Sequence, residues 1–132
     1  MKLTFPYGRE TRSIEIPDNR IKGVLVSKLH HYKVDKTQEE LVEEALANPI
    51  GSPPLCELAK GKKKVVLIAS DHTRPVPSKV IVPPMLREIR KGNPDADITI
   101  LIATGCHRSM SREEIVSKFG EEIANREKIV VH

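Results

Sequence analysis

Three runs of aliphatic residues stand out in the pattern of hydrophobic and polar positions along the second half of the chain. Residues 65–69 and 98–103 are almost continuously apolar, and a third run occupies residues 129–131. Continuous aliphatic runs of this length are typical of strands buried in a parallel sheet. Helical patterns separate the three runs, which predicts an α/β fold with a Rossmann-like, mainly parallel sheet flanked by helices.

The segment between the first two strands contains a predicted helix. Pro83 and Pro84 fit best in the first turn of this helix, because proline lacks the N–H group that a helix interior uses. The helix is expected to continue through residues 85–91 and to end at Gly92. The pattern leaves open whether residues 78–82 belong to it.

Two capping boxes mark the starts of further helices. Thr37 with Glu40 begins a helix that has one apolar face, and Ser111 with Glu114 begins another. A short helix is also expected at residues 53–59, where proline comes early and glycine follows the end.

The first third of the chain differs from the rest. Residues 3–5 and 13–16 alternate like the strands of a β-hairpin, and residues 21–26 are expected to add another short strand. We expect one N-terminal α/β domain or fragment. Residues 1–60 would form its hairpin and helices, and residues 61–132 its strand-helix-strand-helix-strand core.

Composition and charge narrow the possible partners. The chain has 132 residues, 39% of them hydrophobic and only 3% aromatic, so its core must be aliphatic. The net charge of +4 comes largely from a lysine cluster at residues 60–64, which we interpret as a solvated turn rather than a phosphate patch. No aromatic residues lie near it, so nucleic acid is not expected as a partner.

Two further observations concern the compartment. Cys56 and Cys106 form no CxxC pair, which indicates a reducing cytoplasm. No apolar stretch approaches the roughly 18 residues of a membrane span, so no membrane association is expected.

Two polar loops carry the candidate chemistry. They occupy residues 70–77 and 103–108, directly after the first two predicted strands. A right-handed parallel crossover brings both loops to the carboxyl edge of the sheet, where open α/β sheets bind ligands. This edge would hold Asp71, Arg74 and His107 within reach of one another.

The residues alone leave several roles open. Arg74 suits a bidentate clamp on a carboxylate or phosphate, while Asp71 suits a hydroxyl partner or a group that orients Arg74. A local Asp71–Arg74 pair that stabilises the loop is an equal alternative. His107 suits a general acid or base, or a merely structural position. Cys106 is interpreted as a small buried packing residue rather than a nucleophile or metal ligand.

Several motifs occur in order from about residue 65 to the end of the chain. They are Ser-Asp-His-Thr-Arg-Pro-Val-Pro at 70–77, Gly-Asn-Pro-Asp-Ala-Asp at 92–97, Ala-Thr-Gly-Cys-His-Arg at 103–108, Glu-Glu at 113–114 and Lys-Phe-Gly at 118–120. In sequence, order and spacing these motifs resemble those of the nickel-dependent lactate racemase family.

The resemblance implies the N-terminal part of a racemase or epimerase of a lactate-like 2-hydroxy acid. The family carries a nickel-pincer nucleotide, and a histidine removes the hydroxyl proton while the α-hydride moves to this cofactor. Carried over to this sequence, His107 becomes the acid/base and Arg74 the residue that binds the substrate carboxylate. Asp71, Thr73 and Arg108 are expected to lie near the cofactor.

Other parts of such a site are expected after His132. They are a second acid/base histidine, the lysine that tethers the cofactor and the histidine that binds nickel, so no metal ligand is assigned here. The expected partners are a small 2-hydroxy acid and the C-terminal remainder of the same protein, without which this fragment should be inactive. Two alternatives are a non-catalytic anion- or nucleotide-binding α/β domain and a scaffold domain.

Overall fold

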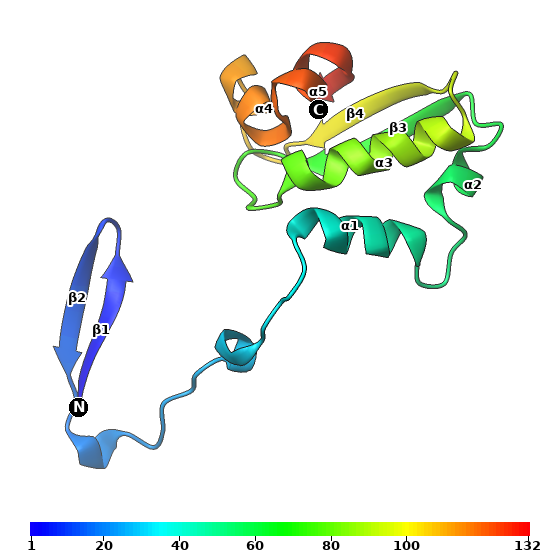
Figure 1. The fold of residues 1–132 in the computed structure, drawn as a ribbon. Helices are drawn as coiled ribbons and strands as arrows, with labels where there is room; N and C mark the ends of the chain where they lie inside the picture. The colour runs from blue at the N-terminus through cyan, green and yellow to red at the C-terminus, as the bar shows by residue number, and fades with distance from the viewer. The chain divides into compact units, whose positions relative to one another are not determined.

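The computed structural model describes residues 1–132, which divide into two compact units (Figure 1). The first unit is Met1–Asp35 and the second is Lys36–His132. Each unit is described by itself below.

The first unit begins with the expected β-hairpin. Strands β1 (Lys2–Tyr7) and β2 (Glu10–Glu15) pair in antiparallel fashion, with Leu3 opposite Ile14. The chain turns at Gly8, which has a φ of +62° that favours glycine over residues with a side chain. Two short 3₁₀ helices follow, η1 and η2, at Asp18–Arg20 and Lys28–His31.

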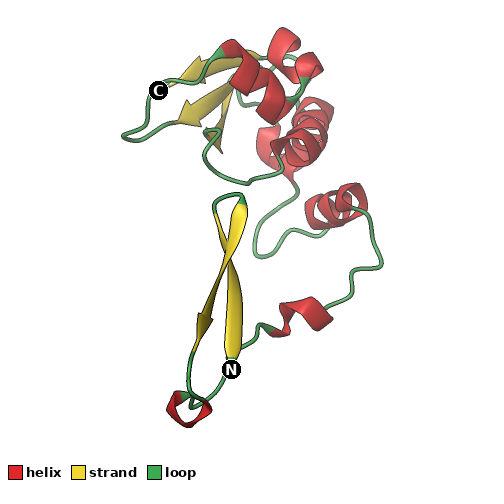
Figure 2. Cartoon of the chain, turned by 90° about the vertical axis from the view of Figure 1, so that its left-hand side faces the viewer, coloured by secondary structure: helices red, strands yellow, loops and turns green.

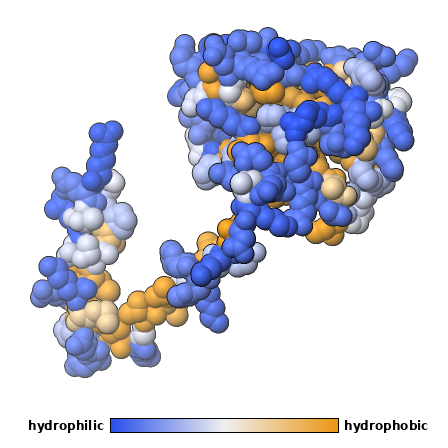
Figure 3. Space-filling view, in the orientation of Figure 1, coloured by the Kyte–Doolittle hydropathy of each residue, from blue (hydrophilic) through white to orange (hydrophobic).

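The expected strand at residues 21–26 is not formed, so this prediction is wrong. A strand requires neighbouring backbone groups to pair with, and the sheet of this unit contains only β1 and β2. Of the hydrophobic side chains that suggested a strand, Val24, Leu25 and Val26 are exposed, and Figure 3 shows hydrophobic residues along the extended segment. Leu25 is fully exposed, and Val26 is 69% exposed.

A three-stranded parallel sheet forms the centre of the second unit and confirms the predicted fold class. Val65 lies opposite Ile98, and Leu101 lies opposite Val130. The strands, in their order across the sheet, are β3 (Lys64–Ser70), β4 (Asp97–Ala103) and β5 (Lys128–Val131).

The helices of this unit are α1 (Gln38–Ala47), α2 (Leu55–Ala59), α3 (Ser78–Gly92), α4 (Arg112–Phe119) and α5 (Glu121–Arg126). Both predicted capping boxes are present at the starts of α1 and α4. Helix α5 was not expected from the pattern, because only Gly120 separates it from α4. None of the helices combines the length and hydrophobicity that crossing a membrane requires.

Helix α3 differs from the prediction at its start. It begins at Ser78, so Pro83 and Pro84 lie inside the helix rather than in its first turn. Each proline removes one helical hydrogen bond. Burial offsets this loss, because Val82 and Leu86, on either side of the prolines, are both buried in the core.

Helices lie against one face of the sheet (Figures 1 and 2), and the hydrophobic core lies between them and this face. Ile100 and Ile102 of β4 are completely buried, as is Ile89 of α3 in the same cluster. On the other face, Ile68 is 75% exposed and Val130 is 41% exposed. The chain's own helices therefore cover only one face of a sheet type that usually has both faces covered.

Gly92 closes α3 at a point where α2 approaches closely. A Cβ atom at this position would lie 1.8 Å from the backbone oxygen of Cys56. We therefore expect Gly92→Ala to lower the free energy of unfolding by about 1–3 kcal/mol, the usual cost of overpacking. Gly23→Ala is the matched control, because nothing lies within 4 Å of its added Cβ. Urea denaturation gives the free energy of unfolding of both variants. A Gly92→Ala variant more stable than the unsubstituted protein would contradict the close approach of Cys56 to Gly92.

Candidate active site

The loops that follow β3 and β4 meet at the carboxyl edge of the sheet, as the predicted crossover requires. Asp71 comes directly after β3, and its side chain is only 3% exposed. His107 lies in the loop after β4, and its side chain is 44% exposed. The buried Thr104 hydroxyl at the start of this loop donates to the carbonyl of His132 at 2.7 Å. The loop is thereby tied to the end of β5.

The Asp71 carboxylate accepts hydrogen bonds at both of its oxygens. Its Oδ1 atom accepts from the hydroxyl of Thr73 at 2.6 Å and from the backbone N–H of Thr73 at 3.1 Å. Its Oδ2 atom lies 2.6 Å from Nδ1 of His107. Hydrogen bonds from Thr73 and then from His107 hold the pKa of Asp71 well below its usual range, against the opposing effect of burial. Asp71 is therefore ionised at neutral pH.

This ionised carboxylate fixes the orientation of the His107 ring. A carboxylate can only accept hydrogen bonds, so Nδ1 of His107 must be the donor in the 2.6 Å contact. The other ring nitrogen, Nε2, is then left to exchange a proton with a ligand. A carboxylate that holds an imidazole in one tautomer is the arrangement that general acid–base catalysis uses.

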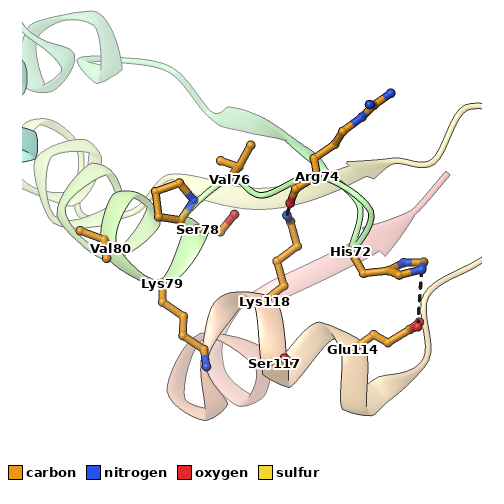
Figure 4. Close-up of a pocket in the computed structure, with 10 residues that line it drawn as sticks. His72, Arg74, Val76, Ser78, Lys79, Val80, Glu114, Ser117 and Lys118 are labelled. Atoms are coloured by element: carbon orange, nitrogen blue, oxygen red, sulfur yellow. Dashed lines mark hydrogen bonds and ion pairs between the residues drawn. The ribbon is translucent and has the colours of Figure 1, made fainter. Parts of the chain in front are cut away.

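Arg74 lies in the same loop as Asp71. Its backbone carbonyl is hydrogen-bonded within the chain, whereas its guanidinium is not. Lys118 Nζ donates to its carbonyl oxygen at 3.2 Å. Its guanidinium makes no hydrogen bond or ion pair within the chain, and Figure 4 shows it directed away from Lys118. The alternative of a local Asp71–Arg74 side-chain pair is therefore not found, and the guanidinium remains available for an anion.

A second bridge joins the two loops beside the Asp71–His107 pair. The Arg108 guanidinium donates to both carboxylate oxygens of Glu114, at 2.6 and 2.9 Å. His72 Nε2 lies 3.6 Å from the same carboxylate (Figure 4). The hydrogen bonds from Arg108, and next that from the backbone of Ser111, lower the pKa of Glu114 to about 2. The sequence indicated only the helix-capping role of Glu114, because no local pattern signals contacts with both loops.

Cys106 is exposed, so the prediction of a buried packing residue is wrong. The residue follows Gly105, whose φ of +59° belongs to a turn at the surface. Met110, further along the same loop, fills the core instead and is only 7% exposed.

A pocket of about 380 Å³ lies between the loop after β3, the start of α3 and helix α4 (Figure 4). Its cationic and imidazole lining residues are His72, Arg74, Lys79 and Lys118, and Glu114 is the single acidic one. Burial lowers the pKa of Lys118 from its ordinary value. Asp71 and His107 are not among the residues that line this pocket.

The residue types at this edge suit hydrogen bonding and anion binding. No group of three or more histidine, cysteine, aspartate or glutamate side chains lies in an arrangement that could hold a metal ion. The arrangement can orient an imidazole, accept or donate a proton at Nε2 and clamp a carboxylate with Arg74.

Comparisons with known proteins agree with this architecture. A family model for the lactate racemase N-terminal domain matches residues 7–132. The lactate racemases of Thermoanaerobacterium thermosaccharolyticum and Lactiplantibacillus plantarum are each 49% identical to the chain over 130 residues, or 98% of it. The match covers 30% of the first protein and 31% of the second, so the chain spans less than a third of their length.

Solved structures show the same relationship. The lactate racemase apoprotein from T. thermosaccharolyticum superposes with a TM-score of 0.87 at 46% identity, covering all of this chain and 30% of that one. A Thermotoga maritima protein shows a likeness of fold alone, with a TM-score of 0.53 at 24% identity over 71% of this chain and 21% of that one.

Proposed function

The chain belongs to the family of lactate racemase N-terminal domains, and on this premise we propose that it supplies part of the active site of a 2-hydroxy-acid racemase or epimerase. The observation that carries the proposal is the Asp71–His107 pair at the sheet edge, with Arg74 in the same loop as Asp71 and its guanidinium unpaired. A 2-hydroxy acid presents a carboxylate and an adjacent hydroxyl group. These need an anion clamp and a proton acceptor on converging loops.

In the proposed reaction, each residue acts on one group of the substrate. Arg74 binds the carboxylate through two parallel hydrogen bonds, and His107 Nε2 takes the proton of the hydroxyl group and later returns it. Racemisation would also require the α-hydride to leave the carbon that bears this hydroxyl group, giving a planar 2-keto acid, and to return to the opposite face. Asp71 keeps His107 in the tautomer that accepts a proton.

The nickel-pincer nucleotide would supply the hydride acceptor. Asp71, Thr73 and Arg108 are the residues proposed to lie against it, and of the three the exposed Arg108 guanidinium offers free hydrogen-bonding groups. Arg108 uses three of the five N–H groups of a guanidinium within the chain, which leaves two for a ligand. Following the family resemblance, the proposal places the nickel ligand, the tethering lysine and the second histidine in the C-terminal remainder.

The proposal also places the protein in the cytoplasm. Cys56 and Cys106 are both free thiols in the structure. Free thiols persist in reducing compartments. The proposed partners are a small 2-hydroxy acid and the C-terminal remainder of the same protein.

A domain exchange tests the proposed function. Residues 1–132 would replace the matching N-terminal part of the T. thermosaccharolyticum lactate racemase, with which the chain shares 49% identity. The cofactor-loaded chimera is then assayed for conversion of L-lactate to D-lactate. We expect racemisation, because the fold and the proposed site residues would be in place.

The matched control is the same exchange with the N-terminal part of the L. plantarum enzyme, which shows whether the junction tolerates a foreign domain. An active control beside a folded, cofactor-loaded but inactive chimera would contradict a lactate racemase role. Anion binding without turnover would then favour the non-catalytic binding domain.

Substitution of Arg74 tests the proposed carboxylate clamp. Arg74→Ala should raise KM for the 2-hydroxy acid at least roughly tenfold and also lower kcat, because a lost charge-assisted pair weakens both binding and orientation. Arg74→Lys keeps the charge without the bidentate geometry. Its KM and kcat should therefore lie between those of Arg74→Ala and those of the unsubstituted enzyme. Arg126→Ala, at an exposed arginine of α5, is the control. Unchanged kinetics in Arg74→Ala would remove Arg74 from the site.

A further inference from the structure

The two loops of the site are joined twice, by bridges that involve neighbouring residues. Asp71 contacts His107 directly. The next residue of each loop, His72 and Arg108, contacts Glu114, which belongs to the first turn of α4. The second bridge therefore runs parallel to the first, one residue further along both loops.

We propose that Glu114 is a positioning residue for the acid–base pair, holding the His107 loop in place by binding Arg108 beside His72 of the Asp71 loop. This inference rests on the proposed function. Glu114 lies in α4, outside both loops, and its carboxylate contacts a side chain from each of them. Figure 4 shows it reaching towards His72 from the helix.

The geometry around Glu114 makes this bridge rigid. Arg108 holds the carboxylate through two parallel hydrogen bonds, a pairing that fixes both partners in one plane. The backbone N–H of Ser111 donates to the same carboxylate at 2.9 Å, so the side chain is anchored to the start of α4. The Glu114 side chain is only 25% exposed, which limits screening by solvent.

Glu114 and Lys118, on successive turns of α4, contact different loops of the site. Lys118 lies one turn beyond Glu114 on the same face of α4, and it holds the carbonyl of Arg74 rather than His107. On loss of the Glu114 charge the loop of residues 70–77 keeps its contact with Lys118, whereas the loop of residues 103–108 loses its contact through Arg108, so His107 should be disturbed more than Arg74. In kinetic terms, kcat should fall while KM changes little.

Glu114→Gln is the informative variant, because glutamine also serves at this capping position but carries no charge for the paired hydrogen bonds from Arg108. In the full-length, cofactor-loaded enzyme we expect kcat to fall about 10- to 100-fold with KM within about twofold, as small misplacements of reacting groups cause. Glu113→Gln is the matched control on the same helical turn. His72→Gln removes only the contact with the Asp71 loop and should show a smaller loss.

A second readout does not depend on activity. The ¹⁵N shifts of the His107 ring should report a protonated Nδ1 and a free Nε2 in the unsubstituted protein, and an averaged tautomer in Glu114→Gln. If this change occurs in a protein that does not racemise any 2-hydroxy acid, the positioning role stands and the proposed function fails. If the protein racemises but Glu114→Gln leaves both kcat and the His107 shifts unchanged, the positioning role is wrong.

Discussion

Replacement of His107 by glutamine should lower kcat for 2-hydroxy-acid racemisation by roughly two to four orders of magnitude, the usual contribution of a general acid–base group. The effect follows from the position of the ring. Asp71 occupies Nδ1 at 2.6 Å, so Nε2 is the nitrogen that can take the hydroxyl proton. Glutamine keeps a polar group of similar size but has no site that gains and loses a proton at neutral pH.

Initial rates in both directions, measured by chiral chromatography, test this prediction. The two enantiomers are equal in free energy, so kcat/KM must stay equal in the two directions, and His107→Gln should lower both together. His30→Gln, at an exposed histidine of η2, is the control. Added imidazole should partly restore the rate of His107→Ala, since it can enter the vacated space. Rates equal to those of the unsubstituted enzyme in both directions would remove His107 from the chemistry.

Replacement of Asp71 by asparagine should be almost as damaging, although the substitution hardly changes size. The amide oxygen of the introduced side chain would keep the two hydrogen bonds from Thr73, which leaves the NH₂ group facing His107. Nδ1 of His107 would then have to accept, and the ring proton would move to Nε2. A wrong tautomer of this kind lowers kcat by on the order of 10⁴-fold in a catalytic triad.

The pH dependence of racemisation gives a second test of the role of Asp71. Its pKa lies well below the usual range, held there by hydrogen bonds from Thr73 and His107. Asp71 therefore stays charged as the pH falls, and its titration should not appear in the activity profile near pH 4. Asp95→Asn, at an exposed aspartate, is the matched control. An Asp71→Asn enzyme with full activity would show that the carboxylate does not set the tautomer.

The parts of the fold that local sequence determines could be predicted. Continuous aliphatic runs located the strands of the parallel sheet, which extend from the predicted ranges by one or two residues. The capping boxes located the starts of α1 and α4, because each depends on two residues three apart. Strand order and a right-handed crossover were then enough to place Asp71 and His107 at one edge.

The features that could not be predicted depend on tertiary contacts. Pro83 and Pro84 lie inside α3 because core packing offsets the lost hydrogen bonds, whereas propensity alone favours the first turn. Asp71 pairs with His107 rather than with Arg74, although Arg74 is closer in sequence. The sequence indicates only a capping role for Glu114, because its contacts with His72 and Arg108 form only when the two loops meet in the folded structure.

The measurement that tests the central claim most directly is racemisation of a panel of 2-hydroxy acids by the full-length, cofactor-loaded protein. Chiral chromatography follows each pure enantiomer over time. We expect interconversion of at least one enantiomer pair, and the pair would identify the substrate. A folded protein with bound cofactor that converts no member of the panel, lactate included, would contradict the claim that this domain serves a 2-hydroxy-acid racemase.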